Sequence, residues 1–243
     1  MTTPEIVSAP ASQPSVLDDI IEIFYAPSRV FARQRDNPRF WGAFIILSIL
    51  FALGVWVMMR NLASVMDAQM SRQMAEALRK NPQLTQDQLE RGRRIGEMMA
   101  PISGLFIAVI TTLILGVVIW VIGKFFDSKA DVNQGLMIAT FASFPKVIDL
   151  ILAAVLALVL GTDNIPNMLV ATPSLARFAP TGIAPQLLGL LSRLSIGIVW
   201  ATILIAIGLH VVGRIPKARA YAAAVIIWLL GSALVIATAA RSV

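Results

Sequence analysis

Cysteine is absent from this chain of 243 residues, and histidine occurs once. Without thiols the protein has no disulfide, thiolate metal site or cysteine nucleophile, and a single histidine excludes metal centres built from several histidines. Charged residues are also scarce, at 14% of the chain against roughly a quarter in soluble domains. No GxSxG or HExxH motif occurs. We therefore predict a protein that is not an enzyme, with no catalytic residues, no metal and no cofactor.

Apolar residues take the place of the missing charges: they form 57% of the chain, and the mean hydropathy is +0.77. Three stretches lack any charge: Phe40 to Met59, Ala100 to Gly123 and Tyr221 to Ala240. Each has about 20 residues, enough at ~1.5 Å per residue to cross a ~30 Å hydrocarbon core. Two further apolar stretches contain charges. We predict an all-α polytopic membrane protein whose five spans cover, approximately, residues 40–59, 100–123, 136–160, 187–212 and 220–240.

The basic residues predict the orientation, because cytoplasmic flanks of membrane helices carry an excess of Lys and Arg. Nine lie before the first span and in the 2/3 and 4/5 loops: Arg29, Arg33, Arg35, Arg39, Lys124, Lys129, Arg214, Lys217 and Arg219. The 3/4 loop and the C-terminal tail carry one each, whereas the seven in the connection after the first span are mixed with acidic residues. We therefore expect a cytoplasmic N-terminus, a C-terminus on the other side, and no binding of nucleic acid.

Residues 61–99 are predicted to form an extramembrane hairpin of two helices on the non-cytoplasmic side. The first helix continues the first span as far as Asn81–Pro82, and the second begins at TQDQ, where Thr85 and Gln88 match a capping box. The methionines of this segment either hold the two helices together or line a partner surface: they are Met66, Met70, Met74, Met98 and Met99.

The N-terminal tail, residues 1–39, contains SVLDDIIEIFYAPSRVF. Apolar residues fall there at helical spacing, opposite Asp18, Asp19 and Glu22. This pattern predicts an amphipathic helix that lies along the membrane interface and stops at Pro27, unless a soluble partner docks on it.

The third predicted span carries Pro145, Lys146 and Asp149 near its middle. Lys and Asp cost about 3 kcal/mol each at mid-bilayer, so this span inserts only marginally by itself. Lys146 and Asp149 share a helix face and can pair, Pro145 predicts a kink, and Arg193 of the fourth span can approach Asp149. Two interpretations remain: a buried polar site used for binding or as a hinge, or an ion pair that fixes helix register.

Small residues recur every four positions in the spans, which allows close contact between helices in lipid. The predicted packing positions are Gly104, Ala108, Thr112, Gly116, Ala153, Ala157, Gly161, Gly197 and Ala201. Most of them are expected to build the internal bundle. A stripe left on the outside would bind another membrane protein or a second copy.

Three segments carry a family resemblance: GKFFDSKADVNQGLMIATFASFPKVIDLILAAVLALV, IEIFYAPSRVFARQRDNPRFW and WATILIAIGLHVVGRIPKARAYAAAVIIWLLG. They are similar, in this order, to the central signature, the segment before the first span and the last two spans of the Yip (Ypt-interacting protein) domain family. The resemblance covers Val16 to Ala240 and implies a five-span fold with a cytoplasmic N-terminus. The chain resembles a bacterial member, which implies the inner membrane and a periplasmic C-terminus.

Eukaryotic relatives bind small GTPases, but the DLYGP-type motif is absent here, so GTPase binding is not carried over. The resemblance and the small-residue stripes favour a scaffold or accessory subunit that acts through helix contacts in the bilayer, alongside transport or efflux machinery. The alternative is a small transporter or channel that uses Pro145, Lys146, Asp149 and Arg193 as a polar site.

Overall fold

The computed structural model describes residues 14–62, 85–160, 172–180 and 182–240, together with scattered positions between 67 and 81. Helices dominate these ranges, in which strand-like pairing is limited to one isolated bridge. In chain order they are α1 (Val16–Glu22), α2 (Pro27–Gln34), α3 (Trp41–Asn61), α5 (Gln86–Phe125), α6 (Val132–Leu160), the 3-10 helix η2 (Leu175–Phe178), α8 (Pro185–Ser192), α9 (Ile196–Val211) and α10 (Lys217–Ala240). The predicted all-α class is confirmed.

Four helical segments are long and apolar enough to cross a membrane: Trp41–Asn61, Ile102–Phe125, Val132–Val159 and Lys217–Thr238. They correspond to the first, second, third and fifth predicted spans, so the chain is a polytopic membrane protein. About half of the α6 segment is buried inside the molecule, against 22–28% of the other three. The α6 helix is therefore the centre of the bundle, in contact with α3, α5 and α9.

The fourth predicted span, 187–212, is divided into two helices in the structure. The chain breaks between α8 and α9, and α9 has only 16 residues. The hydroxyl of Ser195 accepts a hydrogen bond from the backbone N–H of Ile198 at 3.1 Å and so begins a new helix. Ser195 also forms the isolated bridge, with Ser174. Serine competes for backbone hydrogen bonds in this way, a local effect that hydropathy does not reveal.

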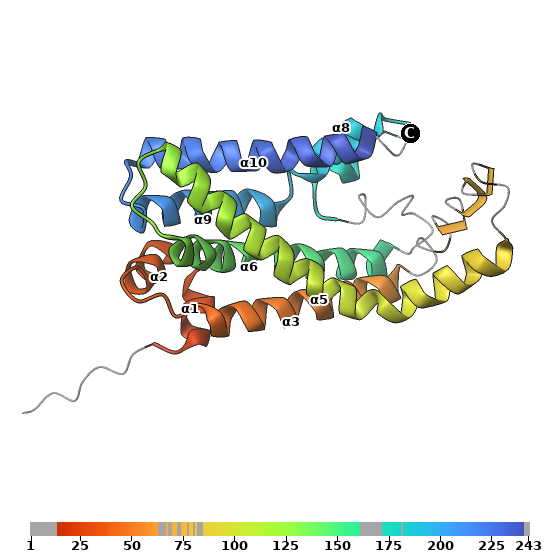
Figure 1. Cartoon of the computed structure of the whole chain (residues 1–243), viewed down its shortest axis with the longest axis horizontal. Helices are drawn as coiled ribbons and strands as arrows, with labels where there is room; N and C mark the ends of the chain where they lie inside the picture. Colours follow the sequence, from red (N-terminus) through yellow and green to blue (C-terminus); the bar gives the residue numbers. More distant parts are fainter. Residues whose placement is uncertain are drawn as a thin grey trace, which may run out of the picture.

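The α5 helix combines the second arm of the predicted hairpin with the second span in 40 residues. Thr85 and Gln88 form the predicted capping box at its start. Figure 1 shows α5 extending past the end of α3, consistent with a length of ~60 Å at 1.5 Å per residue. Much of the first arm lies outside the described residues, but an ion pair of 3.5 Å joins Asp67 to Arg93 of α5.

The N-terminal segment forms two helices at one end of the bundle, which we call the α2 end (Figure 1). The prediction that Pro27 stops the first helix was wrong. The α1 helix has already ended at Glu22, and Pro27 begins α2. Proline suits the first turn of a helix because its missing N–H has no partner there in any case. The loops after α5 and α9 meet at the same end, where the Lys129 N–H donates to the carbonyl of Gly213 at 3.0 Å.

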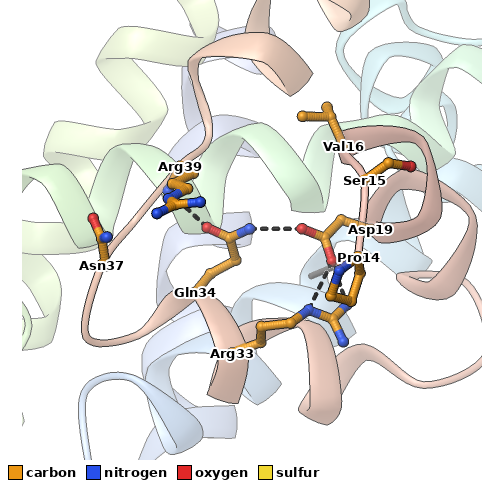
Figure 2. A pocket seen from close by; sticks show the side chains of 8 residues that line it. All are labelled: Pro14, Ser15, Val16, Asp19, Arg33, Gln34, Asn37 and Arg39. Carbon is orange, nitrogen blue, oxygen red and sulfur yellow. Dashed lines mark hydrogen bonds and ion pairs between the residues drawn. The ribbon is translucent and has the colours of Figure 1, made fainter. Parts of the chain in front are cut away.

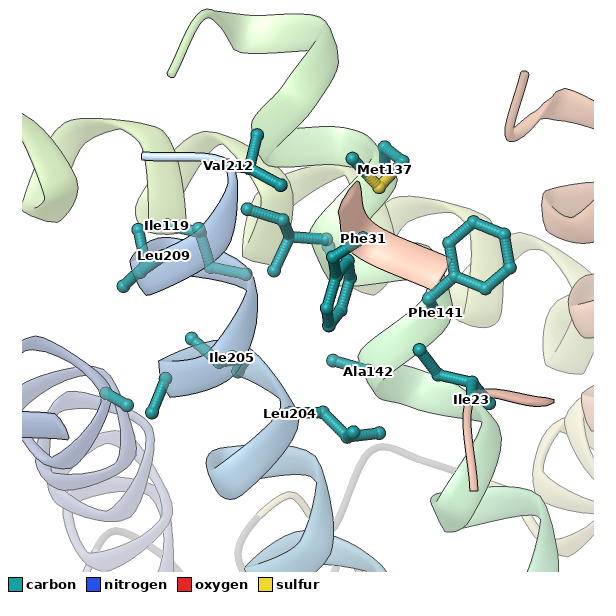
Figure 3. Packing of buried hydrophobic residues seen from close by; sticks show 14 of the residues in the cluster. Ile23, Phe31, Ile119, Met137, Phe141, Ala142, Leu204, Ile205, Leu209 and Val212 are labelled. Carbon is teal, nitrogen blue, oxygen red and sulfur yellow. The ribbon is translucent and has the colours of Figure 1, made fainter. Parts of the chain in front are cut away.

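A buried apolar core closes the α2 end. Phe31 of α2 is fully buried and lies between α6 and α9 (Figure 3). The side chains around it include Met137 and Phe141 of α6 and Leu209 of α9, all buried. Tight packing of this kind holds α2 in the bundle, so the segment before the first span is part of the fold.

The predicted small residues lie mostly on inward faces. A Cβ on Gly104 would lie 3.3 Å from Val55 of α3, and one on Gly116 would lie 2.8 Å from the Cα of Leu136 in α6. The other described members of the set are buried or in close contact with a neighbouring helix: Ala108, Thr112, Ala153, Ala157, Gly197 and Ala201. Gly161 lies outside the described residues. These positions set the helix spacing within the bundle.

Candidate functional site

The predicted polar residues of the third span meet the start of α9. Asp149 accepts hydrogen bonds from the Ser195 hydroxyl at 2.7 Å and from the backbone N–H of Gly197 at 2.9 Å. We call Lys146, Asp149, Arg193 and Ser195 the intramembrane cluster. Asp149 lies 17 residues after the start of α6, which at 1.5 Å per residue is about 26 Å from the α2 end.

Asp149 replaces the helical partners that the break in the fourth span removes. The first N–H groups of a helix have no partner within it, and they carry a positive partial charge. Where water is excluded, such groups need a partner from the protein, and a carboxylate from a neighbouring helix stabilises the break. The contact also requires glycine, because a Cβ on Gly197 would lie 2.5 Å from the Pro145 carbonyl oxygen and 2.6 Å from Asp149 Oδ2. Pro145 itself lies within α6, which continues through it.

The expected ion pairs of this cluster are corrected by the structure. Within the described parts of the chain, no salt bridge of 4.0 Å or less joins Asp149 to Lys146 or to Arg193. The physical reason is that both Asp149 oxygens bind donors at the α9 terminus, which sequence spacing did not reveal. Lys146 is close enough to interact electrostatically with both Asp149 and Arg193.

Arg193 turns away from Asp149 toward α10. Its Nη2 would lie 2.9 Å from a Cβ on Gly231, and its backbone carbonyl accepts a hydrogen bond from Trp228 Nε1 at 3.2 Å. The Nε atom of Arg193 is buried without a hydrogen-bond partner. The cluster therefore contains two cations and one carboxylate, and that carboxylate is already bound to neutral donors.

A second polar cluster, which sequence reasoning missed, joins α1 to α2. Arg33 Nε donates to Asp19 Oδ1 at 3.0 Å, and Arg33 Nη2 forms an ion pair with Glu22 Oε2 at 2.6 Å. Gln34 Nε2 donates to Asp19 Oδ2 at 2.6 Å (Figure 2). Asp19 and Glu22 are only 4% and 7% exposed. We call these four residues the α1–α2 cluster.

The α1–α2 cluster changes the expected orientation of α1 only in part, because Val16, Ile20 and Phe24 still pack against the core. Two of its acidic residues face inward, whereas Leu17, Ile21 and Tyr25 are exposed. Burial alone would lower the pKa of Arg33, but its hydrogen bonds to Glu22 and Asp19 raise the pKa overall. A detectable signal was present in the sequence: acidic residues three apart are followed by Arg29 and Arg33 four apart. It identifies a helix pair only once Pro27 is recognised as the start of a second helix.

A cavity of about 430 Å³ adjoins this cluster and is lined by Pro14, Ser15, Val16, Asp19, Arg33, Gln34, Asn37 and Arg39 (Figure 2). Its polar lining contains groups of both signs that already bind one another. Gln34 Oε1, for example, accepts the backbone N–H of Arg39 at 2.7 Å. Among the described residues there is no group of three metal-ligating side chains. The described polar groups of the cavity therefore join α1 to α2 and to the segment before α3.

Comparisons with known proteins extend over almost the whole chain. The model of the family described as Yip1 domain matches residues 21–238. A protein named membrane protein YknW, from Bacillus subtilis (strain 168), is 25% identical over 207 residues, which cover 85% of this chain and 83% of that protein. No solved structure gives a significant match. The matched residues include the intramembrane cluster and, apart from Asp19, the α1–α2 cluster.

Proposed function

The chain belongs to the Yip1 domain family of membrane proteins, and from this premise we propose that it is a scaffold or accessory subunit that acts without catalysis. It lies in the bacterial inner membrane with its N-terminus in the cytoplasm and its C-terminus in the periplasm. Helix contacts join it to another membrane protein or to a second copy, alongside transport or efflux machinery. GTPase binding is not part of the proposal.

An outward apolar stripe on α5 carries this proposal. Ile95, Met98 and Met99 are 60%, 74% and 48% exposed, and Ile102 and Phe106 continue the stripe into the membrane span. Gly104 lies on the opposite side of the helix, against α3. The apolar span begins at Ile102, so the first three residues present apolar side chains beyond it. Exposed apolar patches mark interaction sites, and methionine adapts to irregular partners.

The exposure of Met98 and Met99 supports one of the two roles that the sequence leaves open for the methionines of this segment. Helices of a hairpin would hold together through residues that each arm buries against the other. Met98 and Met99 are instead exposed, while Arg93 forms the ion pair with Asp67 of the first arm. The outward position supports a partner surface over an internal contact.

The experiment places a photo-crosslinking amino acid at position 98 of the full chain in native membranes, with position 94 as the matched control. Arg94 is also exposed but lies to one side of the stripe. We expect a crosslinked product at 98 and little at 94, and a partner or homo-oligomer that co-purifies in mild detergent. Met98→Glu should release it, whereas Arg94→Glu should not. A monomer with no crosslink at either position would overturn the proposal.

One observation favours a transporter as the second candidate. The break between α8 and α9 places a helix N-terminus inside the membrane, as in transporters whose broken helices bind substrates. Against it, Asp149 already binds that terminus, and Phe31 closes the bundle at the α2 end. Flux into proteoliposomes that Asp149→Ala abolishes, with the helical content unchanged, would reverse the ranking.

A further inference from the structure

A groove between α9 and α10 opens on the outer surface of the bundle. Its volume is about 340 Å³, and its lining includes Val199, Ile203, Ala224 and Val225. The polar atoms of two other lining residues are already bound: the Thr202 hydroxyl donates to the Ile198 carbonyl at 2.9 Å, and Trp228 Nε1 donates to the Arg193 carbonyl. The groove is therefore an apolar surface suited to a hydrocarbon chain.

A cation lies at one end of this groove. Trp228 lines the groove, and the guanidinium of Arg193 rests one helical turn further along α10, against Gly231. Because α10 begins at the α2 end (Figure 1), this is the groove end that faces the opposite side of the membrane. From Tyr221 to Trp228 the groove extends along α10 for about 10 Å at 1.5 Å per residue.

Among the described residues, no salt bridge balances the charge on Arg193. No carboxylate of the described ranges lies within 4.0 Å of its guanidinium, and its Nε is buried without a partner. Lys146 adds a second positive charge nearby, while the oxygens of Asp149 are bound by Ser195 and Gly197. An arginine in apolar surroundings requires a counter-charge.

We infer that this groove holds an anionic phospholipid, with one acyl chain along α9 and α10 and its phosphate on the Arg193 guanidinium. Guanidinium groups bind phosphate through two parallel hydrogen bonds, and the groove supplies the apolar contact for the chain. Trp228 lies between the two parts, as amphipathic aromatic residues do between lipid tails and headgroups. The lipid belongs to the leaflet opposite the α2 end, which is the periplasmic leaflet in the proposed orientation.

The test uses the full chain, purified in mild detergent and titrated with phosphatidylglycerol or phosphatidylcholine in native mass spectrometry. We expect at least about tenfold tighter binding of phosphatidylglycerol, since both lipids carry the phosphate but the choline cation of phosphatidylcholine offsets its negative charge beside Arg193. Arg193→Gln should abolish the preference, and Arg193→Lys should retain part of it. Arg60→Gln is the matched control, because Arg60 lies over Trp56 on α3, away from the groove.

Three further variants separate the contribution of the groove from that of the charge. Val225→Trp fills the groove from an exposed position and should weaken both lipids, whereas Leu230→Trp, equally exposed but outside the groove, should weaken neither. Gly231→Ala should displace the guanidinium and lower the preference without removing the charge. Equal binding of the two lipids by the wild type would overturn the inference, as would an unchanged preference in folded Arg193→Gln and Gly231→Ala. If inorganic phosphate competed fully with phosphatidylglycerol, the site would bind a free anion, and the assignment to a lipid would be overturned.

Discussion

In the α1–α2 cluster two buried carboxylates share one guanidinium, whereas in the intramembrane cluster one carboxylate binds neutral donors and two cations lie beside it. The partners in the first cluster are 11 to 15 residues apart along the chain. Those in the second are 46 and 48 residues apart, on helices that meet only in the assembled bundle. In the first cluster the opposite charges come from adjacent segments and balance one another. In the second, Asp149 binds the neutral donors at the start of α9, and the two cations exceed the one carboxylate.

The largest effect is expected for Arg33→Met, which leaves Asp19 and Glu22 without their shared cation. Removing one partner of a buried ion pair costs about 3–5 kcal/mol, and we expect the lower end because Arg33 is partly exposed. Thermal unfolding in detergent measures the loss. Arg29→Met is the matched control, because Arg29 binds the same Glu22 with a side chain that is 73% exposed. Equal effects of the two variants would show that the cluster is not held by Arg33.

Asp149→Ala is expected to cost about 2–3 kcal/mol, because two donors at the start of α9 lose their acceptor. Asp149→Asn keeps one acceptor oxygen and should cost less. Lys146→Met is the matched comparison and should cost less than Asp149→Ala. It removes only a cation that forms no salt bridge within the described ranges. If Lys146→Met destabilises the protein as much as Asp149→Ala in the same unfolding assay, an ion pair fixes the cluster after all.

A smaller effect, about 1–2 kcal/mol, is expected for Gly197→Ala, since the new methyl group would press on the Pro145 carbonyl and the Asp149 carboxylate. Gly96→Ala is the control within a helix. No atom lies within 4 Å of the Cβ position at Gly96, so that variant should stabilise α5 by about 0.5–1 kcal/mol. Detergent unfolding of both variants tests the sign. A stabilising Gly197→Ala would mean that α6 and α9 do not approach closely there.

The smallest expected effect is the pH dependence of the α1 cap. Hydrogen bonds from the Ser15 side chain and backbone lower the pKa of Asp18 below its usual 3.8. A lowered folded-state pKa stabilises the protein above the unfolded value, and this stabilisation is lost as the pH falls through the folded value. Melting temperatures at about pH 5 and about pH 3 should therefore differ less in Asp18→Asn than in the wild type. The same pH dependence in both would exclude a contribution from the cap.

The fold class and three of the membrane helices follow from composition, because uncharged stretches of this length have few stable places other than lipid. The capping box at Thr85 was also predictable from the sequence, since it depends on residues three positions apart. The division of the fourth span into two helices was not predicted. The apolar run of this span is interrupted only briefly, at Arg193, and the break there is stabilised by the hydrogen bonds that Asp149 accepts from Ser195 and Gly197 and by the Ser195 cap on Ile198.

By itself the sequence determined that this chain enters a membrane as helices, since hydropathy, helix length and capping are local properties. Only the tertiary structure decided which charges find partners. Asp19 and Glu22 turned inward because α2 folds back with Arg33, Asp149 bound a distant helix terminus, and Arg193 was left beside an apolar groove. Charged groups interact according to their distance in space. The spacing of residues along one helix does not determine how far they lie from residues on another helix.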